Sequence, residues 1–288
     1  MYLGMSLPAD WRAFAASSPW RTPIAPGARV DPNSGAMMAR LKSWLQGENR
    51  ILRLQTESEK YTAPVHVVSA GTPLVTIVSD SDLPVYMDPD RNRTALVPIT
   101  AEMWADPSND SHVVIIMEST AFEFWHFRRE GSGYRCGMGG LWNLDGPGYN
   151  PSPMPNGANA ARLPYIGGLA RGEEALSGRI EHALNMVAPT TGTGYRWPAT
   201  ASDGRVWGKS GIPEGARVQL DPAFPLTALL PATRIIARCL QVYGAIVMDS
   251  AAGWNVKLQN YGAGAKNPWA AHPFDFEHIP FEAYRVLA

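Results

Sequence analysis

Short β-favouring runs separated by Gly, Pro, Asp and Asn fill residues 50–99, and they constrain the fold more than any other feature of the sequence. The runs are ILRLQ, PVHVV, LVTIVS, LPVYM and ALVPI, and their spacing is the one expected of a β-sandwich. A continuous apolar run, HVVIIM (112–117), then predicts a buried strand. Helical patterns are too few for alternating strand and helix units, which argues against a doubly wound sheet. The sequence therefore predicts a mainly β protein.

Two segments have apolar residues at helical spacing. The first is predicted to run from residue 34 to 46 after a cap at Asn33 or Ser34, and the second from Pro231 to Gly244. Their apolar faces consist of Met37, Leu41, Trp44 and Leu45 in the first helix and of Ile235, Ile236, Cys239, Leu240 and Tyr243 in the second. The expected architecture is a β-sandwich with two accessory helices.

The chain of 288 residues is predicted to form one domain, because all-β sandwiches of about 200 to 250 residues commonly do so. Its expected order is an irregular lead-in (1–33), a helix (34–46), strands and loops (50–227), a helix (231–244), and a hairpin with an irregular tail (245–288). The hairpin would join AIVMD to WNVKL around SAAG. The Pro-, Gly- and Asn-rich stretch 145–163 exceeds the usual loop length of about 12 to 15 residues, and we expect it to wall a groove.

Composition and charge exclude several classes of function. A formal net charge of -1 without a Lys/Arg block offers no electrostatic footprint for nucleic acid. No apolar run approaches the roughly 20 residues that span a bilayer. Cys136 and Cys239 lack metal-ligand spacing and are expected to be buried thiols. The beginning of the chain lacks a basic region followed by an apolar stretch, so we expect no secretory signal in it.

A series of motifs in the second half carries a family resemblance. They are GRIEHAL (178–184), YRWPATASDG (195–204), IPEGARVQLDP (212–222) and RIIARCLQVYGAIVMDSAAGWNV (234–256), and SPWRTPI, VDPNSGAM and HVVIIM with TAFEFW extend the match toward residue 18. The chain resembles uncharacterised jelly-roll-like proteins found in secreted proteins of soil bacteria and in minor tail proteins of actinobacterial phages. The resemblance implies a jelly-roll or concanavalin-like sandwich that acts on glycans. It transfers no catalytic residues, and MES at 117–119 departs from the aspartate-rich strand end of the typical member.

The alternating run TAFEFWHF supplies the first candidate site residues. Alternation places Glu123 and Trp125 on one face of a strand, with Phe122, Phe124 and His126 on the other. A carboxylate beside an indole on an open sheet face suits a sugar ring, because the ring stacks on the indole while the carboxylate binds hydroxyls. The alternative is an ordinary half-buried strand with a solvated or arginine-paired glutamate.

In GRIEHALNMV, the same alternation puts Arg179, Glu181 and Asn185 on one face and His182 on the other. Glu181 is the stronger candidate for a groove, whereas His182 fits a hydrogen-bonded core histidine better than a catalytic base. If Glu123 and Glu181 were on neighbouring strands about 5 to 10 Å apart, they would form the carboxyl pair of a glycosidase.

The remaining candidates lie at turns. Asp249 ends the AIVMD strand and Asp203 lies in the turn after WPAT, where an aspartate commonly binds its own backbone. Trp197 precedes a proline and is either an exposed stacking platform or a buried anchor, with burial favoured. No zinc, nucleotide or serine-hydrolase motif is present, so no metal or cofactor is predicted, although calcium bound by loop Asp and Asn oxygens stays open.

Three functions remain open at this stage. The first is a glycan-recognising β-sandwich protein, phage tail-associated or on a cell surface, that binds a polysaccharide through Trp125, Arg179, Asn185, Trp197 and Asp249. The second is a carbohydrate-active enzyme on the same fold, a glycoside hydrolase or a polysaccharide lyase, with Glu123, Glu181, His182 and Tyr195 as catalytic candidates. The third is a structural phage assembly protein with virion or homo-oligomer partners. In each case the expected location is extracellular or in a virion.

Overall fold

The computed structural model describes residues 6–151, 154–262, 267–270 and 272–288. The protein is mainly β, as predicted. The helices of the described residues are α1 (Ser34–Gly47), α2 (Tyr165–Gly168), α3 (Gly172–Ser177) and α4 (Pro231–Val242), with 3-10 turns η1 (Phe276–His278) and η2 (Phe281–Ala283). None of these helices has the length and apolar character needed to cross a membrane.

The described strands form three larger sheets and one short pair. The outer sheet has the order β4 (Thr94–Val97), β3 (Val75–Ser79), β8 (Gly133–Cys136) and β7 (Arg128–Glu130). The central sheet has the order β2 (Val65–Val68), β5 (Val113–Met117), β6 (Thr120–Trp125) and β9 (Met138–Asn143). The large sheet has the order β1 (Gln55–Glu57), β15 (Asn255–Lys257), β10 (Leu184–Ala188), β14 (Ala245–Ser250), β13 (Arg217–Leu220) and β16 (Tyr284–Val286), and β11 (Thr191–Tyr195) pairs with β12 (Ile212–Glu214).

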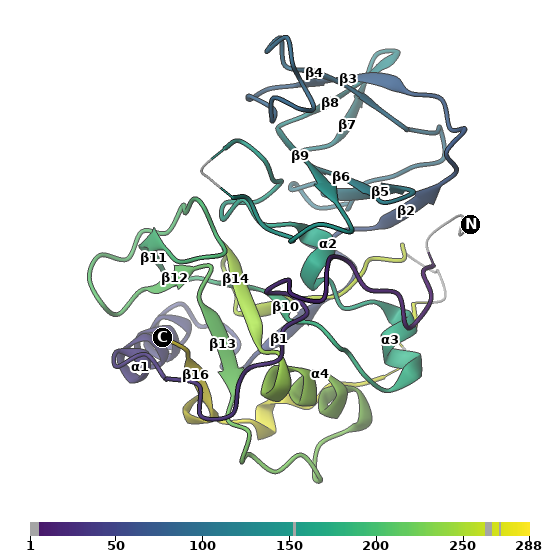
Figure 1. The fold of residues 1–288 in the computed structure, drawn as a ribbon. Coiled ribbons are helices and arrows are strands. Elements are labelled where there is room, and N and C mark those ends of the chain that lie inside the picture. The colour runs from purple at the N-terminus through teal and green to yellow at the C-terminus, as the bar shows by residue number, and fades with distance from the viewer. Residues whose placement is uncertain (1–5, 152–153, 263–266, 271) are drawn as a thin grey trace.

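The central sheet is buried on both faces, and this sets the layering of the molecule (Figure 1). In β5, Val113 and Ile115 pack into a core shared with the outer sheet, whereas Val114 and Ile116 pack into a second core with Ile246 of β14. Neighbouring residues of a strand point to opposite faces, so a continuous apolar run such as HVVIIM requires this two-sided burial. The predicted buried strand is thereby confirmed.

The large sheet is buried in the same way. Met186 of β10 and Val247 of β14 face a third core with α1, α4 and the C-terminal segment, whereas Val187 and Met248 face the central sheet. The sequence pattern does not predict this third sheet beneath the sandwich. Its strands are only three to six residues long, and packing between layers rather than strand length stabilises it.

Both predicted helices are present. α1 begins one residue after Asn33, ends one residue beyond the predicted end, and buries Met37, Leu41 and Leu45. α4 begins at Pro231 as predicted, and Gly244 follows its end with a positive φ of 69°. Cys239 of α4 and Cys136 of β8 are buried and free, which confirms two buried thiols.

The predicted hairpin between AIVMD and WNVKL is wrong. β10 lies between β14 and β15, pairing parallel with the first and antiparallel with the second. β10 is the strand LNMVA, all of whose residues are buried, and a strand with two buried faces gains most from an interior position in the sheet. Residues 251–254 therefore cross over the end of β10 instead of forming a tight turn.

The loop 145–163 contains no helix or strand among its described residues, and residues 152 and 153 lie outside the described part of the chain. Three buried asparagines bind backbone groups of the loop and its surroundings. Asn150 donates to Asn156 O and Arg162 O, Asn156 donates to Leu141 O, and Asn159 donates to Leu163 O. Met154 and Pro155 line a cavity of about 520 Å³ beside Asp82 and Arg91, so the loop walls a minor hollow.

A buried carboxylate joins the central sheet to α2. Glu123 of β6 is fully buried, and its oxygens accept the backbone N–H groups of Tyr165 (2.7 Å) and Ile166 (2.8 Å) and the indole N–H of Trp142 (3.1 Å). On the other side of α2, Asn185 of β10 donates to Tyr165 O at 2.6 Å. The main chain of Tyr165 is therefore held from both sheets at once.

Replacement of Glu123 by Ala is expected to lower the free energy of unfolding by about 3 to 5 kcal/mol, because three donors lose their acceptor and a cavity forms in the core. Denaturant titration measures this change. The matched control is Glu130→Ala on β7, whose side chain is 59% exposed, and for which we expect a change of about 0.5 kcal/mol or less. Equal losses in the two variants would contradict this role for Glu123.

Candidate functional site

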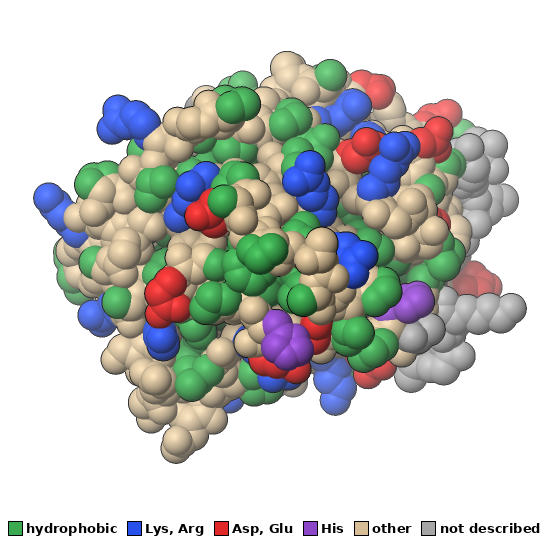
Figure 2. Space-filling model, turned by 90° about the horizontal axis from the view of Figure 1, so that it is seen from below, with side chains coloured by type: hydrophobic (Ala, Val, Ile, Leu, Met, Phe, Trp, Pro, Cys, Tyr) green, Lys and Arg blue, Asp and Glu red, His purple; other side chains and the backbone are tan. Residues whose placement is uncertain are grey.

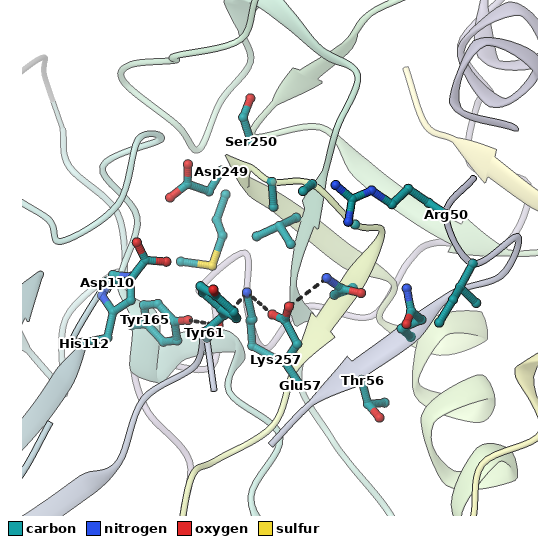
Figure 3. Close-up of a pocket in the computed structure, with 18 of the residues that line it drawn as sticks. Arg50, Thr56, Glu57, Tyr61, Asp110, His112, Tyr165, Asp249, Ser250 and Lys257 are labelled. Atoms are coloured by element: carbon teal, nitrogen blue, oxygen red, sulfur yellow. Dashed lines mark hydrogen bonds and ion pairs between the residues drawn. The ribbon is translucent and has the colours of Figure 1, made fainter. Parts of the chain in front are cut away.

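A cavity of about 580 Å³ opens between the large sheet and the central sheet (Figure 3). Its floor is formed by β1, β15 and the end of β14, together with Val187 of β10. Asp110 and His112, which precede β5, approach from the central sheet, and Tyr165 of α2 lies between the two. The cavity thus depends on residues that are far apart in the sequence, brought together by the layering of the sheets.

A buried ion pair forms part of the floor. β1 and β15 run parallel with Glu57 opposite Lys257, so their side chains share a face, and the Lys257 ammonium binds the Glu57 carboxylate. Asn255, two residues before Lys257 on the same face, donates to Glu57 at 2.8 Å, and Lys257 also donates to Tyr61 O at 2.6 Å. Burial raises the pKa of Glu57 although Lys257 opposes the shift.

Asp249, the residue before the last one of β14, lies at the cavity wall and belongs to a group of three acidic side chains. Burial and then the charge of Asp203 raise the pKa of Asp249 to about 7, and the N–H of Ala160 at 3.5 Å is a weak partner. Glu214 of β12 is fully buried, and burial together with the nearby Asp203 raises its pKa to about 9. Neither carboxyl oxygen of Glu214 has a hydrogen-bond partner of good geometry among the described residues. At neutral pH this group therefore holds protons.

A histidine and a tyrosine form the wall on the side of the central sheet. The rings of His112 and Tyr165 are in contact, with centroids 4.7 Å apart. Burial and the charge of Lys257 lower the pKa of His112 to about 3, so this imidazole is neutral at physiological pH. Its Nδ1 atom is buried and has no hydrogen-bond partner of good geometry in the described chain. Burial raises the pKa of Tyr165, whose hydroxyl stays protonated.

Asp110 is held at the cavity by a rigid loop. The buried Asp106 accepts the N–H of Ser108 (2.9 Å) and of Tyr61 (3.0 Å), which fixes the segment that leads to Asp110. The indole N–H of Trp125 reaches the Asp110 carboxylate at 3.3 Å. In Figure 3, Asp110 and Asp249 lie on the same side of the cavity, each from a different sheet.

Arg50 supplies a second cation at the cavity. The residue is exposed, its guanidinium points toward the open space in Figure 3, and it forms no ion pair with any described residue. Tyr61, 47% exposed, adds an aromatic face at the mouth. The cavity therefore combines a free cation, a buried ion pair, protonated and ionisable carboxyl groups and neutral hydrogen-bonding rings.

The predicted site residues are distributed over several places, and Asp249 is one that lines this cavity. Trp125 does not line the cavity, but its indole N–H binds Asp110, which does. The Trp125 ring also stacks on His126, with ring centroids 3.4 Å apart. Glu123 does not lie on an open sheet face as expected, because the second face of β6 is also buried. Its carboxylate instead positions Tyr165, whose ring reaches the cavity.

The candidates of GRIEHAL lie elsewhere. The expected strand begins only at Leu184, and Glu181, in the preceding loop, pairs with Arg12 at 2.6 Å and lies 3.7 Å from Arg179. His182 is a buried histidine that binds Glu174 at 3.1 Å and Ala183 O at 2.8 Å, as the core interpretation predicted. Glu123 and Glu181 thus have separate partners. Glu123 is bound by α2, whereas Glu181 pairs with Arg12 of the N-terminal segment.

Trp197 and Tyr195 lie beside β11, away from the main cavity. Trp197 is 63% exposed, so the prediction that it is buried is wrong. It lines a second hollow of about 430 Å³ with Arg196 and Arg217, and the edge of the Tyr149 ring approaches it at 5.4 Å between centroids. Tyr195 is 48% exposed. The short β11–β12 pair offers too little apolar surface to cover either ring.

The surface in Figure 2 shows acidic and basic side chains interspersed among apolar ones on that face, without a single-sign patch. This arrangement agrees with the low net charge. Among the described residues, no group of three or more His, Cys, Asp or Glu side chains is arranged to hold a metal ion. The described residues therefore do not locate a calcium site.

Most cavity residues were not found from the sequence. They come from separate segments and include Arg50, Glu57, Tyr61, Asp110, His112, Tyr165 and Lys257. One signal was present in WNVKL, where the polar residues Asn255 and Lys257 flank Val256 in a strand whose neighbours are apolar. A lysine and an amide on one face of a buried strand require polar partners, and Glu57 supplies them.

Comparisons of the chain with protein families, with curated proteins and with solved structures gave no match. Functional inference therefore starts from the cavity itself.

Stability is expected to fall as the pH rises from about 4.5 to 9. Asp249 and Glu123 hold their protons to about pH 7 and Glu214 to about pH 9 in the folded state, whereas the unfolded chain releases them near pH 4. We expect the free energy of unfolding to fall by several kcal/mol between pH 5 and 9, since each unit of pKa shift is worth about 1.4 kcal/mol, and denaturant unfolding at each pH measures this loss. Glu214→Gln should flatten the decline, and an unchanged slope in this variant would count against the assignment.

Loss of Lys257 is expected to leave the Glu57 carboxylate without its cation and thereby to lower the free energy of unfolding. Lys257→Met should lower the free energy of unfolding by about 3 to 5 kcal/mol, and the double variant Glu57→Gln with Lys257→Met should recover a large part. Lys42→Met, at an exposed ion pair with Glu282 (2.9 Å), is the control and should change stability by about 0.5 kcal/mol. Equal effects at the two lysines would show that the Glu57–Lys257 pair is not desolvated.

Proposed function

We propose that this protein recognises surface glycan, and that the cavity between the central and the large sheet binds a sugar residue. The observation that carries the proposal is the convergence of charged and hydroxyl-bearing side chains on a cavity of about 580 Å³. Small-molecule sites commonly enclose about 300 to 1,000 Å³, so one or two sugar rings fit this space.

The chemistry of the lining supports a hydroxyl-rich ligand. A sugar presents many donors and acceptors around one ring, and the cavity offers donors from Arg50 and acceptors from Asp110 and Asp249. Tyr61 adds an aromatic face for the apolar side of the ring. Groups held in place before the ligand arrives, as Asp110 is by its loop, reduce the entropy lost on binding.

The proposed setting follows from the resemblance to jelly-roll-like proteins of soil bacteria and actinobacterial phages. The mainly β architecture with a two-sheet sandwich is compatible with a jelly-roll or concanavalin-like form, which is part of the proposal. The partner would be a polysaccharide or a cell-surface glycan, met outside the cell or on a virion. The carboxyl groups of the cavity favour a role in glycan cleavage.

Binding is expected to weaken at least about tenfold in Tyr61→Ala, because loss of a stacking ring removes roughly 1.5 kcal/mol. The measurement is isothermal titration calorimetry with the glycan selected from an array of cell-wall arabinogalactan, peptidoglycan fragments, xylan and pectin. Tyr86→Ala is the matched control, since Tyr86 is 50% exposed and does not line the cavity. If no glycan of the array binds, or if both variants bind as the parent does, the proposed site is wrong.

A further inference from the structure

The cavity contains two carboxyl groups whose surroundings differ in charge. Asp249 lies at the end of β14 with Asp203 and Glu214 beside it, while Asp110 lies on the loop before β5 and accepts a hydrogen bond from Trp125 at 3.3 Å. Both line the same cavity and come from opposite layers. Two carboxyl groups that face one cavity from different surroundings are the equipment of general acid–base catalysis.

We propose that the cavity hydrolyses a glycosidic bond, with Asp249 as the proton donor and Asp110 as the proton acceptor. This inference rests on the proposed function, because the bond that is cleaved belongs to the glycan bound there. Asp249 gives its proton to the glycosidic oxygen, which takes the electron pair of the breaking carbon–oxygen bond. Water attacks the anomeric carbon and its proton passes to Asp110, so one water molecule is consumed for each bond cleaved.

Glu57 is the other carboxylate at the cavity, and its position argues against the role of base. β10 and β15 lie between β14 and β1, so the main chains of Asp249 and Glu57 are three strand spacings, about 14 Å, apart. Glu57 is also bound by Lys257 and Asn255, which occupy its oxygens. We assign this pair to the floor of the binding site rather than to proton transfer.

The protonation of Asp249 has an identifiable electrostatic source. Burial raises its pKa to about 7, and Asp203 adds a further negative charge nearby, while Lys257 opposes the shift. Burial and the nearby Asp203 raise the pKa of Glu214 to about 9, so Glu214 adds no negative charge near Asp249 at neutral pH. No described cation forms an ion pair with Asp249, Asp203 or Glu214. Asp203 is therefore a positioning residue that acts on catalysis through the proton of Asp249.

His112 and Tyr165 line the same cavity as Asp110 and Asp249, and their rings are in contact, with centroids 4.7 Å apart. The imidazole is neutral and the Tyr165 hydroxyl stays protonated. This part of the wall therefore carries no charge that would compete with the two carboxyl groups for a proton.

The experiment compares cleavage and binding of the same glycan in the parent protein and in variants. The glycan is the one that binds most tightly in the array described above, and the readouts are new reducing ends and absorbance at the wavelength of unsaturated sugars. Asp249→Asn and Asp110→Asn are each expected to reduce the cleavage rate about 100-fold or more, with binding weakened much less, because the asparagine amide still forms hydrogen bonds with sugar hydroxyls. Asp145→Asn, an exposed aspartate outside the cavity, is the control and should cleave as the parent does.

The pH profile tests the role of Asp203. Cleavage should decline above about pH 7 as Asp249 loses its proton. In Asp203→Asn the negative charge that raises the pKa of Asp249 is gone, so this alkaline decline should move to lower pH by about one unit. A variant that merely perturbed the fold would lower the rate without moving the decline.

Each outcome decides between the two proposals. Reducing ends that are lost in Asp249→Asn and Asp110→Asn support hydrolysis. A glycan that binds but stays intact, or that yields unsaturated ends, overturns the hydrolase and leaves glycan recognition standing. If no glycan binds, the proposed function fails, and the hydrolase fails with it.

Discussion

The carboxylate of Glu123 is the interaction on which the rest of the structure depends. It lies in the core between the central sheet and α2, where it would be unstable without partners, and two backbone N–H groups and one indole N–H supply them. Asn185 holds the same turn of chain from the large sheet. Because Tyr165 is fixed from both sides, its ring stands at a set position against His112, and the distance between the two sheets is set with it.

The sequence predicted those features that rest on local periodicity. Both main helices, the buried strand at residues 113–117 and the mainly β class follow from patterns within about fifteen residues. The order of strands in the large sheet does not, since β10 enters between β14 and β15 from more than fifty residues earlier in the chain. Alternation shows that a strand has two faces, but whether the second face meets solvent or another sheet is decided by distant segments. The sequence therefore predicts an open sheet face for Glu123, whereas the structure buries both faces of β6.

The same limit applies to the candidate site. The sequence singles out Asp249 because it directly follows the apolar run AIVM, and this property is visible locally. Glu57, Asp110 and Lys257 acquire their importance only when β1, the loop before β5 and β15 meet at one cavity. Conversely, Glu181 and His182 are adjacent in an attractive motif, yet each is bound by a residue distant in the fold, Arg12 and Glu174 respectively. A motif thus indicates which groups are available, while the packing decides which of them face a ligand.

Two buried acidic groups of this protein have opposite electrostatic surroundings, and the contrast bears on function. Burial alone would raise the pKa of Glu174, but His182 and Arg171 lower it to about 2, so this ionised carboxylate stabilises the fold above that pH. Burial and then the charge of Asp203 raise the pKa of Asp249 to about 7, so Asp249 keeps its proton at a pH where the unfolded chain has lost it, and this costs stability as the pH rises. Groups that weaken a fold in this way are found where a protonated carboxyl is needed for chemistry, and Asp249 lines the cavity between the central and the large sheet.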